Sequence, residues 1–138
     1  MSNNIQFPKF KEKYGNYING KFVEPVKGNY FDSITPITGK PFAKAAHSTE
    51  DDLLLAIDAA DKAFETWSRT SATERSNILN RIADRMEQNL DYIAQVETVD
   101  NGKAIRETMN ADIPLAIDHF RYFAGVIRAE EGAVVELD

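Results

Sequence analysis

Cysteine is absent from the 138 residues of this chain. Its absence excludes a disulfide framework, a thiolate metal site and a cysteine nucleophile among these residues. A glycine-rich phosphate-binding turn is also absent, because the seven glycines are dispersed and form neither a GxGxxG pattern nor a P-loop. We therefore assign no catalytic residue and no cofactor-binding residue to this chain.

Long apolar runs and basic blocks are missing as well. Charged residues interrupt every apolar stretch far short of the roughly 20 residues that cross a bilayer. The 16 Lys and Arg are outnumbered by 22 Asp and Glu, which gives a net charge of -6 and no stripe that could follow a nucleic-acid backbone. The first residues lack the apolar stretch and cleavage site of a signal peptide. We expect no membrane and no nucleic acid as partners, and a cytoplasmic location.

The first third of the chain has the signature of short strands and turns. Residues 1–16 are polar and irregular, which is typical of a flexible N-terminal arm. Residues 17–23 place Asn-Gly between two short alternating segments, which predicts a β-hairpin with a type I′ turn. A second extended pair is predicted over 30–35 and 41–46, because Pro and Gly between them favour a turn.

The hydrophobic period then changes to that of an α-helix. A first amphipathic helix should begin after Ser48 or Thr49 and carry one apolar stripe, made of Leu53, Ile57, Ala60, Phe64 and Trp67. Ser71 and Glu74 form a capping box that begins a second helix over about 72–88. Because the connection is short, we expect these two helices to form an antiparallel hairpin.

Two further helices and a terminal strand complete the prediction. The third helix should start at 89–91 and end at Gly102, and the fourth should cover about 107–129 with a kink or break near Pro114. Residues 133–138 have the composition of a strand. The fold class is therefore α+β, with an N-terminal β-hairpin and short strands followed by about four helices.

Several motifs in this order resemble the N-terminal segment of the NAD(P)-dependent aldehyde dehydrogenase superfamily. They read YINGKFV, FDSITPIT, the paired helices from DDLLLAIDAADKAFETW onward, ETVDNGK and FRYFAG. The resemblance is greatest to bacterial acetaldehyde and short-chain aldehyde dehydrogenases. It implies that 17–132 form the N-terminal part of the cofactor-binding domain, the first layer of a Rossmann-like α/β fold, and that 133–138 begin a truncated strand.

The resemblance also implies a reaction. In the family, a cysteine thiolate adds to the aldehyde, hydride passes from the thiohemiacetal to the nicotinamide, and a glutamate activates the water that releases the carboxylic acid. The matching cysteine, asparagine and glutamate would lie beyond residue 138. We therefore expect NAD or NADP and an aldehyde substrate only for the full-length enzyme, a homo-oligomer, and an inactive chain without a cofactor of its own.

Two sets of site residues are implied by the same resemblance. The Asp100 carboxylate with the carbonyl oxygens of Ser33 and Ile34 would hold Na+ or K+, since oxygen ligands suit such hard cations. The alternative is that Asp100 only shapes a helix end. Ala111 and Leu115 would line the substrate entrance of the full enzyme, unless Leu115 is simply a core or bare surface residue.

Two other interpretations of the whole chain remain open. It could be a stand-alone helical interaction module derived from that family, or an unrelated helical bundle with a hairpin arm. For the aromatic side chains, helical spacing favours core packing over a binding platform; these are Trp67, Phe120, Tyr122 and Phe123.

Overall fold

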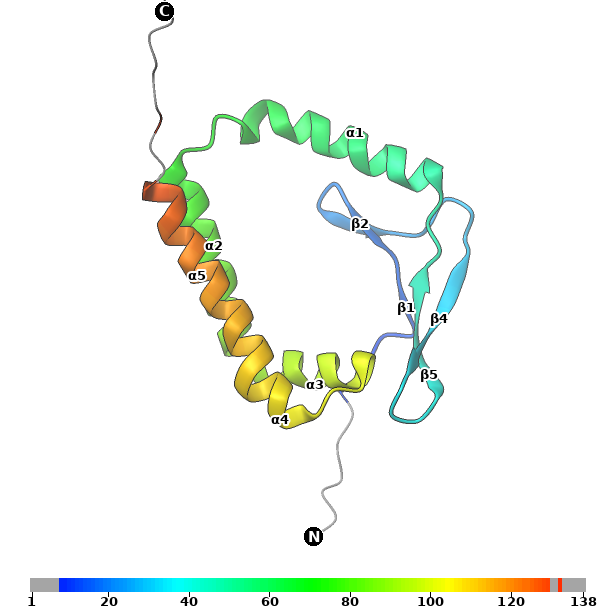
Figure 1. The fold of residues 1–138 in the computed structure, drawn as a ribbon. Helices are drawn as coiled ribbons and strands as arrows, with labels where there is room; N and C mark the ends of the chain where they lie inside the picture. The colour runs from blue at the N-terminus through cyan, green and yellow to red at the C-terminus, as the bar shows by residue number, and fades with distance from the viewer. Residues whose placement is uncertain (1–7, 130–131, 133–138) are drawn as a thin grey trace, which may run out of the picture.

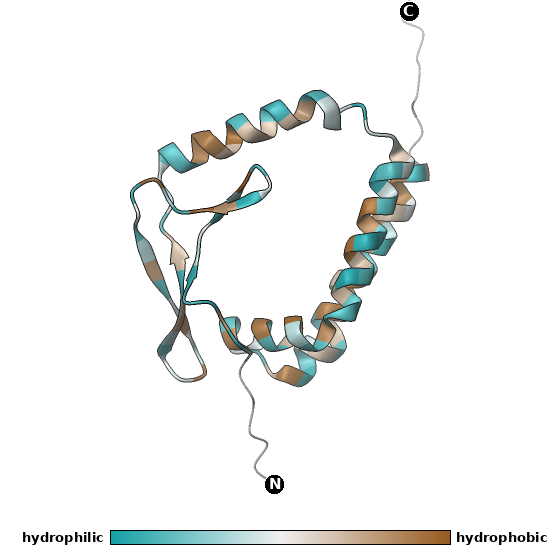
Figure 2. Cartoon of the chain, turned by 180° about the vertical axis from the view of Figure 1, so that it is seen from behind, coloured by the Kyte–Doolittle hydropathy of each residue, from teal (hydrophilic) through white to brown (hydrophobic). Residues whose placement is uncertain are grey.

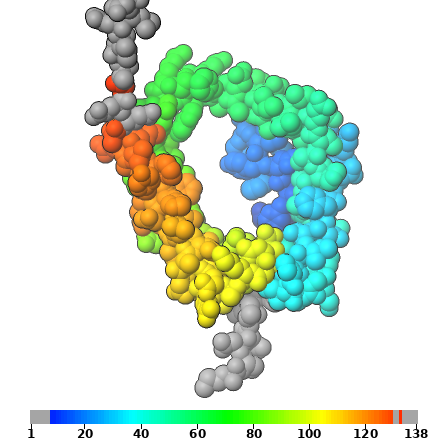
Figure 3. Space-filling view, viewed as in Figure 1, coloured from blue at the N-terminus to red at the C-terminus, as the bar shows by residue number. Residues whose placement is uncertain are grey.

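The computed structural model describes residues 8–129 and 132, and its elements enclose an open ring (Figures 1 and 3). The strands are β1 (Lys13–Tyr14), β2 (Asn16–Ile18), β3 (Lys21–Val23), β4 (Tyr30–Thr35) and β5 (Lys40–Ala46). The helical elements are α1 (Glu50–Trp67), α2 (Ala72–Gln88), α3 (Leu90–Asn101), α4 (Ile105–Glu107), the π-helix η1 (Thr108–Asp112) and α5 (Ile113–Ala129). The predicted strand over 133–138 lies outside the described residues.

The β-hairpin forms as predicted. Strands β2 and β3 pair antiparallel, with Tyr17 opposite Phe22. Asn19 and Gly20 connect them at φ angles of 51° and 78°, the two positive values that a type I′ turn requires. The predicted second pair is confirmed too, because β4 and β5 pair antiparallel in a three-stranded sheet of order β1-β5-β4.

A β-bulge interrupts the β4–β5 ladder. Ser33 lies opposite Ala43, but its neighbour Ile34 lies opposite Pro41, which leaves Phe42 as the extra residue. A bulge disrupts the regular hydrogen-bond ladder and bends the strand that carries the extra residue. The irregularity therefore falls at the two residues whose carbonyl oxygens the resemblance assigns to a cation.

The described part of the expected N-terminal arm contains ordered β-structure. Lys13–Tyr14 form β1, which pairs in parallel with β5. The Lys44 amide donates to the Glu12 carbonyl at 2.9 Å, and the rings of Phe10 and Phe42 pack edge to face with centroids 4.7 Å apart. We expected residues 1–16 to be flexible, but residues 13–14 form a strand, because β5 offers them a free sheet edge.

The second and third helices begin and end close to the predicted positions, but the predicted hairpin of the first two helices is wrong. Helix α2 lies along α5 instead, and α1 leads away from it (Figure 1). The Ser76 hydroxyl donates to the Ala124 carbonyl at 2.6 Å, which fixes α2 to α5. The buried hydrophobic cluster lies here, between α2, α3 and α5: Ala83, Ala94, Ile113 and Ile117.

Helix α1 also differs from the prediction in what covers it. All five residues of the predicted inward stripe are exposed, including Phe64 at 62% and Trp67 at 46%. Apolar segments of α1 are visible along its length in Figure 2. Of the four aromatic residues expected in the core, only Phe120 packs against it. The period predicted the helix correctly, but nothing in the described chain covers its apolar face.

The fourth predicted helix changes its winding just before Pro114, where a kink or break was predicted. Residues 108–112 adopt the wider π-helix, and the Ile113 amide donates to the Thr108 carbonyl five residues earlier. Proline lacks an amide hydrogen and its ring clashes with the carbonyl four residues before it, which disfavours regular α-helix at this point. Among the described residues, no helix is both long enough and apolar enough to cross a membrane.

Candidate functional site

The ETVDNGK motif forms a tight turn at the end of α3. Gly102 has a φ of 79°, and its amide donates to the Thr98 carbonyl at 2.9 Å. The Asn101 side chain accepts from the Lys103 amide at 2.8 Å and donates to Glu97 Oε1 at 2.7 Å. The left-handed conformation suits glycine, which has no Cβ, so the motif ends the helix as the sequence predicts.

This turn is fixed between the sheet and the π-helix. A Cβ atom on Gly102 would lie 3.0 Å from the Cβ of Pro36, so the glycine lets the β4–β5 turn approach α3 closely. On the other side, the Lys103 ammonium lies 2.6 Å from Asp112 Oδ2 in η1. The hydrogen bond to Asp112 raises the pKa of Lys103, and the attraction of nearby carboxylates adds to it. The turn thereby connects three elements.

A pocket of about 340 Å³ lies between α3 and the three-stranded sheet. Asp100 and Ser33 both line it, together with Glu97 and Lys44. Two of the three residues predicted to hold a cation therefore meet at one pocket, while Ile34 is not among its lining residues. The carboxylate, a serine and the neighbouring bulge offer oxygen ligands of the kind that Na+ and K+ take, while the Lys44 ammonium lies 3.6 Å from Asp32 Oδ1.

The two predicted entrance residues share one exposed surface. Ala111 lies in η1 and Leu115 in α5, four positions apart, and both are exposed, with Leu115 at 55%. The buried residues Ile113 and Ile117 point to the opposite, core side. A core position for Leu115 is therefore excluded in the described chain.

A buried aspartate that the sequence analysis did not single out anchors α1. The Asp52 carboxylate accepts hydrogen bonds from the amides of Thr49 and Val26, each at 2.8 Å, and from Asn16 Nδ2 at 3.3 Å. The amide of Thr49 and then that of Val26 are the main reasons why the pKa of Asp52 is lowered. The Thr-x-x-Asp spacing predicts the hydrogen bond between Asp52 and the Thr49 amide. No local sequence pattern predicts the hydrogen bonds from Val26 and Asn16.

The connection from the sheet to the first helix carries no glycine-rich turn of the kind that binds phosphate. Between strand β5 and helix α1 the connection consists of His47, Ser48 and Thr49, without a glycine. At the start of α1, the Asp52 carboxylate already binds the Thr49 amide, in the place where a phosphate would meet the helix N-terminus. Within the part of the chain that the structure describes, no group of three His, Cys, Asp or Glu side chains could hold a metal.

The described residues form small sheets and a layer of helices, with an exposed apolar stripe on α1. The family model described as the aldehyde dehydrogenase family matches residues 22–138. The chain therefore belongs to the aldehyde dehydrogenase family, as its motifs predict.

Curated relatives agree with this assignment. The chain is 61% identical over 129 residues to an aldehyde dehydrogenase of Rhodospirillum rubrum, and 60% identical to an acetaldehyde dehydrogenase of Pseudomonas aeruginosa. Each alignment covers 94% of this chain and 26% of the relative. The chain thus spans about a quarter of the length of these enzymes.

Solved structures share the fold. PnpE from Pseudomonas sp. WBC-3 is 36% identical, with a TM-score of 0.87 over 91% of this chain and 26% of its own, and PnpE has also been solved in complex with NAD. A gamma-glutamyl-gamma-aminobutyraldehyde dehydrogenase from Burkholderia cenocepacia is 32% identical, with a TM-score of 0.86 over 94% of this chain and 27% of its own. The predicted N-terminal layer of the aldehyde dehydrogenase fold is confirmed.

Proposed function

We propose that this chain forms the N-terminal part of a dehydrogenase subunit that oxidises aldehydes to carboxylic acids, with NAD or NADP as the electron acceptor and a cysteine thiohemiacetal as the intermediate. The match to the family over 22–138, with 61% identity to the Rhodospirillum rubrum enzyme, carries the proposal. By itself the chain is inactive, because it has no cysteine to attack the aldehyde.

A chimaera tests this proposal. The chain replaces the matching segment of the full-length Rhodospirillum rubrum relative, and NADH formation from acetaldehyde and NAD+ is followed by ultraviolet absorbance. We expect turnover by the chimaera and none by the isolated chain at the same concentration. Turnover by the isolated chain, or a folded chimaera without turnover on any aldehyde tried, would contradict the proposal.

Within such a subunit, Asp100 and the carbonyl oxygens of Ser33 and Ile34 hold Na+ or K+. The shared pocket of Asp100 and Ser33 and the bulge at Ile34 support this role. The Tm of the chimaera should be higher in NaCl or KCl than in choline chloride, and Asp100→Ala should abolish that difference. Asp91→Ala, which removes a carboxylate from the other end of α3, is the matched control and should retain it.

Ala111 and Leu115 line the aldehyde entrance of the subunit. Both side chains are exposed, which supports the assignment, because residues that line a tunnel cannot be packed into the chain's own core. Replacing Leu115 by Phe in the chimaera should raise the KM for long-chain aldehydes more than that for acetaldehyde. An equal change in both KM values would indicate that the residue lies away from the entrance.

A stand-alone helical interaction module is the second candidate, favoured by the exposed stripe of α1. It predicts a stable isolated chain that binds another protein, and an inactive chimaera. For the dehydrogenase subunit, by contrast, we expect a homo-oligomer with an aldehyde as its substrate. The cytoplasmic location stays a prediction from the sequence.

A further inference from the structure

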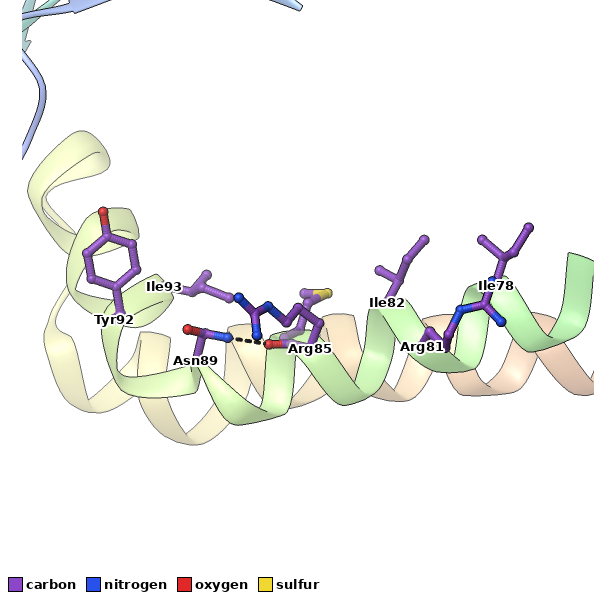
Figure 4. A pocket seen from close by; sticks show the side chains of 8 residues that line it. Ile78, Arg81, Ile82, Arg85, Asn89, Tyr92 and Ile93 are labelled. Carbon is purple, nitrogen blue, oxygen red and sulfur yellow. Dashed lines mark hydrogen bonds between the residues drawn. The ribbon is translucent and has the colours of Figure 1, made fainter. Parts of the chain in front are cut away.

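A groove of about 570 Å³ lies where α2 meets α3 (Figure 4). Figure 4 shows side chains of α2 pointing to the same side as those at the start of α3. The lining combines apolar groups with two cationic ones, among them Ile78, Ile82, Ile93, Arg81 and Arg85. Arg81 and Arg85 are four positions apart in α2, and so are Ile78 and Ile82. Both kinds of side chain therefore lie along one face of the helix.

This groove is a second apolar face of α2, distinct from the face that packs on α5. Ser76 and Ala83 point to the α5 side, where the hydroxyl of Ser76 binds Ala124 and Ala83 is fully buried. In the groove, by contrast, Ile82 is 37% exposed and Tyr92 is 50% exposed. A helix with apolar residues on two faces is typical of one that is covered on both sides.

The two groove arginines form no ion pair within residues 8–129. Among the described residues, no carboxylate lies within ion-pair distance of Arg81 or Arg85, whereas Arg121 binds both Asp84 and Glu87. The chain as a whole has a net charge of -6, so the groove is an apolar and basic region on an acidic protein. Charge complementarity therefore favours an occupant that is apolar and carries carboxylates.

The length of the relatives identifies the source of that occupant. Each curated relative extends well beyond this chain, which matches only 26% of its length. We infer that the α2–α3 groove binds an apolar, carboxylate-bearing segment of the remaining three quarters of the same subunit. The inference depends on the proposed function, since it takes the chain to be part of a dehydrogenase.

The same substitutions in two settings test the inference. Arg81→Gln combined with Arg85→Gln should lower the apparent Tm of the chimaera by roughly 5 °C, because it leaves buried carboxylates without partners. In the isolated chain, where the groove faces solvent, the shift should stay below about 2 °C. Ile82→Ala should likewise lower the Tm of the chimaera more than that of the chain. Arg69→Gln combined with Arg128→Gln, two exposed arginines outside the groove, is the charge-matched control and should change neither Tm.

Equal shifts in both settings would overturn the inference, because the groove would then have no partner in the full subunit. An isolated chain that elutes as a dimer on size exclusion, and returns to a monomer with Ile82→Ala, would also overturn it in favour of a second copy. Aldehyde turnover is measured on the same chimaeras. A chimaera without turnover but with the expected Tm shifts would contradict the proposed activity alone, while normal turnover without those shifts would contradict the groove assignment alone.

Discussion

Replacing Gly102 by Ala should destabilise the chain more than the same change at Gly20. Both glycines have nearly the same positive φ, 79° and 78°. They differ in their surroundings, because a Cβ on Gly102 would lie 3.0 Å from the Cβ of Pro36, whereas a Cβ on Gly20 would meet nothing within 4 Å. The pair therefore separates the cost of backbone conformation from the cost of crowding.

The expected magnitudes follow from these two terms. A left-handed conformation costs an L-residue roughly 1–2 kcal/mol, and this term applies to both variants. Crowding in a packed site typically costs about 1–3 kcal/mol, and the rigid ring of Pro36 has no rotamer that relieves it. Gly20→Ala should thus lose roughly 1–2 kcal/mol of unfolding free energy, and Gly102→Ala roughly 2–5 kcal/mol. The entropy that alanine removes from the unfolded chain is common to both and cancels in the comparison.

Urea unfolding followed by the helical circular dichroism signal measures both losses. The double variant Gly102→Ala with Pro36→Gly, which removes the crowding Cβ of residue 36, completes a mutant cycle, and it should recover the crowding term but not the conformational one. If Gly102→Ala and Gly20→Ala lose the same free energy, the close approach between the motif turn and Pro36 is refuted.

Three other outcomes can be checked in the same way. Thr98 and Thr108 share a buried hydroxyl contact of 2.9 Å, so Thr108→Val should cost about 1–3 kcal/mol in urea unfolding and the double Val variant less than the sum of the two single changes. The pKa of Asp52 is lowered in the folded chain, so its ionised carboxylate contributes to stability fully above the unfolded pKa of about 3.9. This contribution is lost as the pH falls through the lower folded pKa. Asp52→Asn should therefore reduce the pH dependence of the unfolding free energy between about pH 5 and 2. A Cβ on Gly15 would overlap the Val23 carbonyl oxygen, so Gly15→Ala should disturb the hairpin and shift the amide signals of β2 and β3 in NMR spectra. Unchanged shifts would contradict this packing.

Local signals were enough to predict the elements. The Asn-Gly turn, the Ser71 cap and Gly102 each act within a few residues of themselves, and each appears in the structure where the sequence placed it. Pro114 likewise predicted an irregularity in the last helix, which is the π-helix before it. The effect is local, because it comes from the missing amide hydrogen of a single residue.

Partners distant in sequence could not be predicted from the same signals. The short α1–α2 connection suggested a hairpin, but α2 packs on α5, which begins 25 residues after it ends. The apolar stripe of α1 specified a helix without specifying what covers it. At the candidate site, Asp100 and Ser33 line one pocket, and their role as cation ligands stays a prediction from the family resemblance. Asp52 was missed because Val26 and Asn16 approach it only through the fold.

Helix α1 is held at its two ends by hydrogen bonds. Asp52 ties its first turn to the strands, and the Arg75 guanidinium donates to the Trp67 and Ser68 carbonyls at its last turn, each at 3.3 Å. If the hydrogen bonds at either end break, α1 is left as a long solvated helix with few tertiary contacts. We therefore expect α1 to unfold locally before the other helices. In a hydrogen-exchange experiment the α1 amides should therefore exchange as one block, well ahead of α2 and α5, and acid that protonates Asp52 should lower the protection factors of that block.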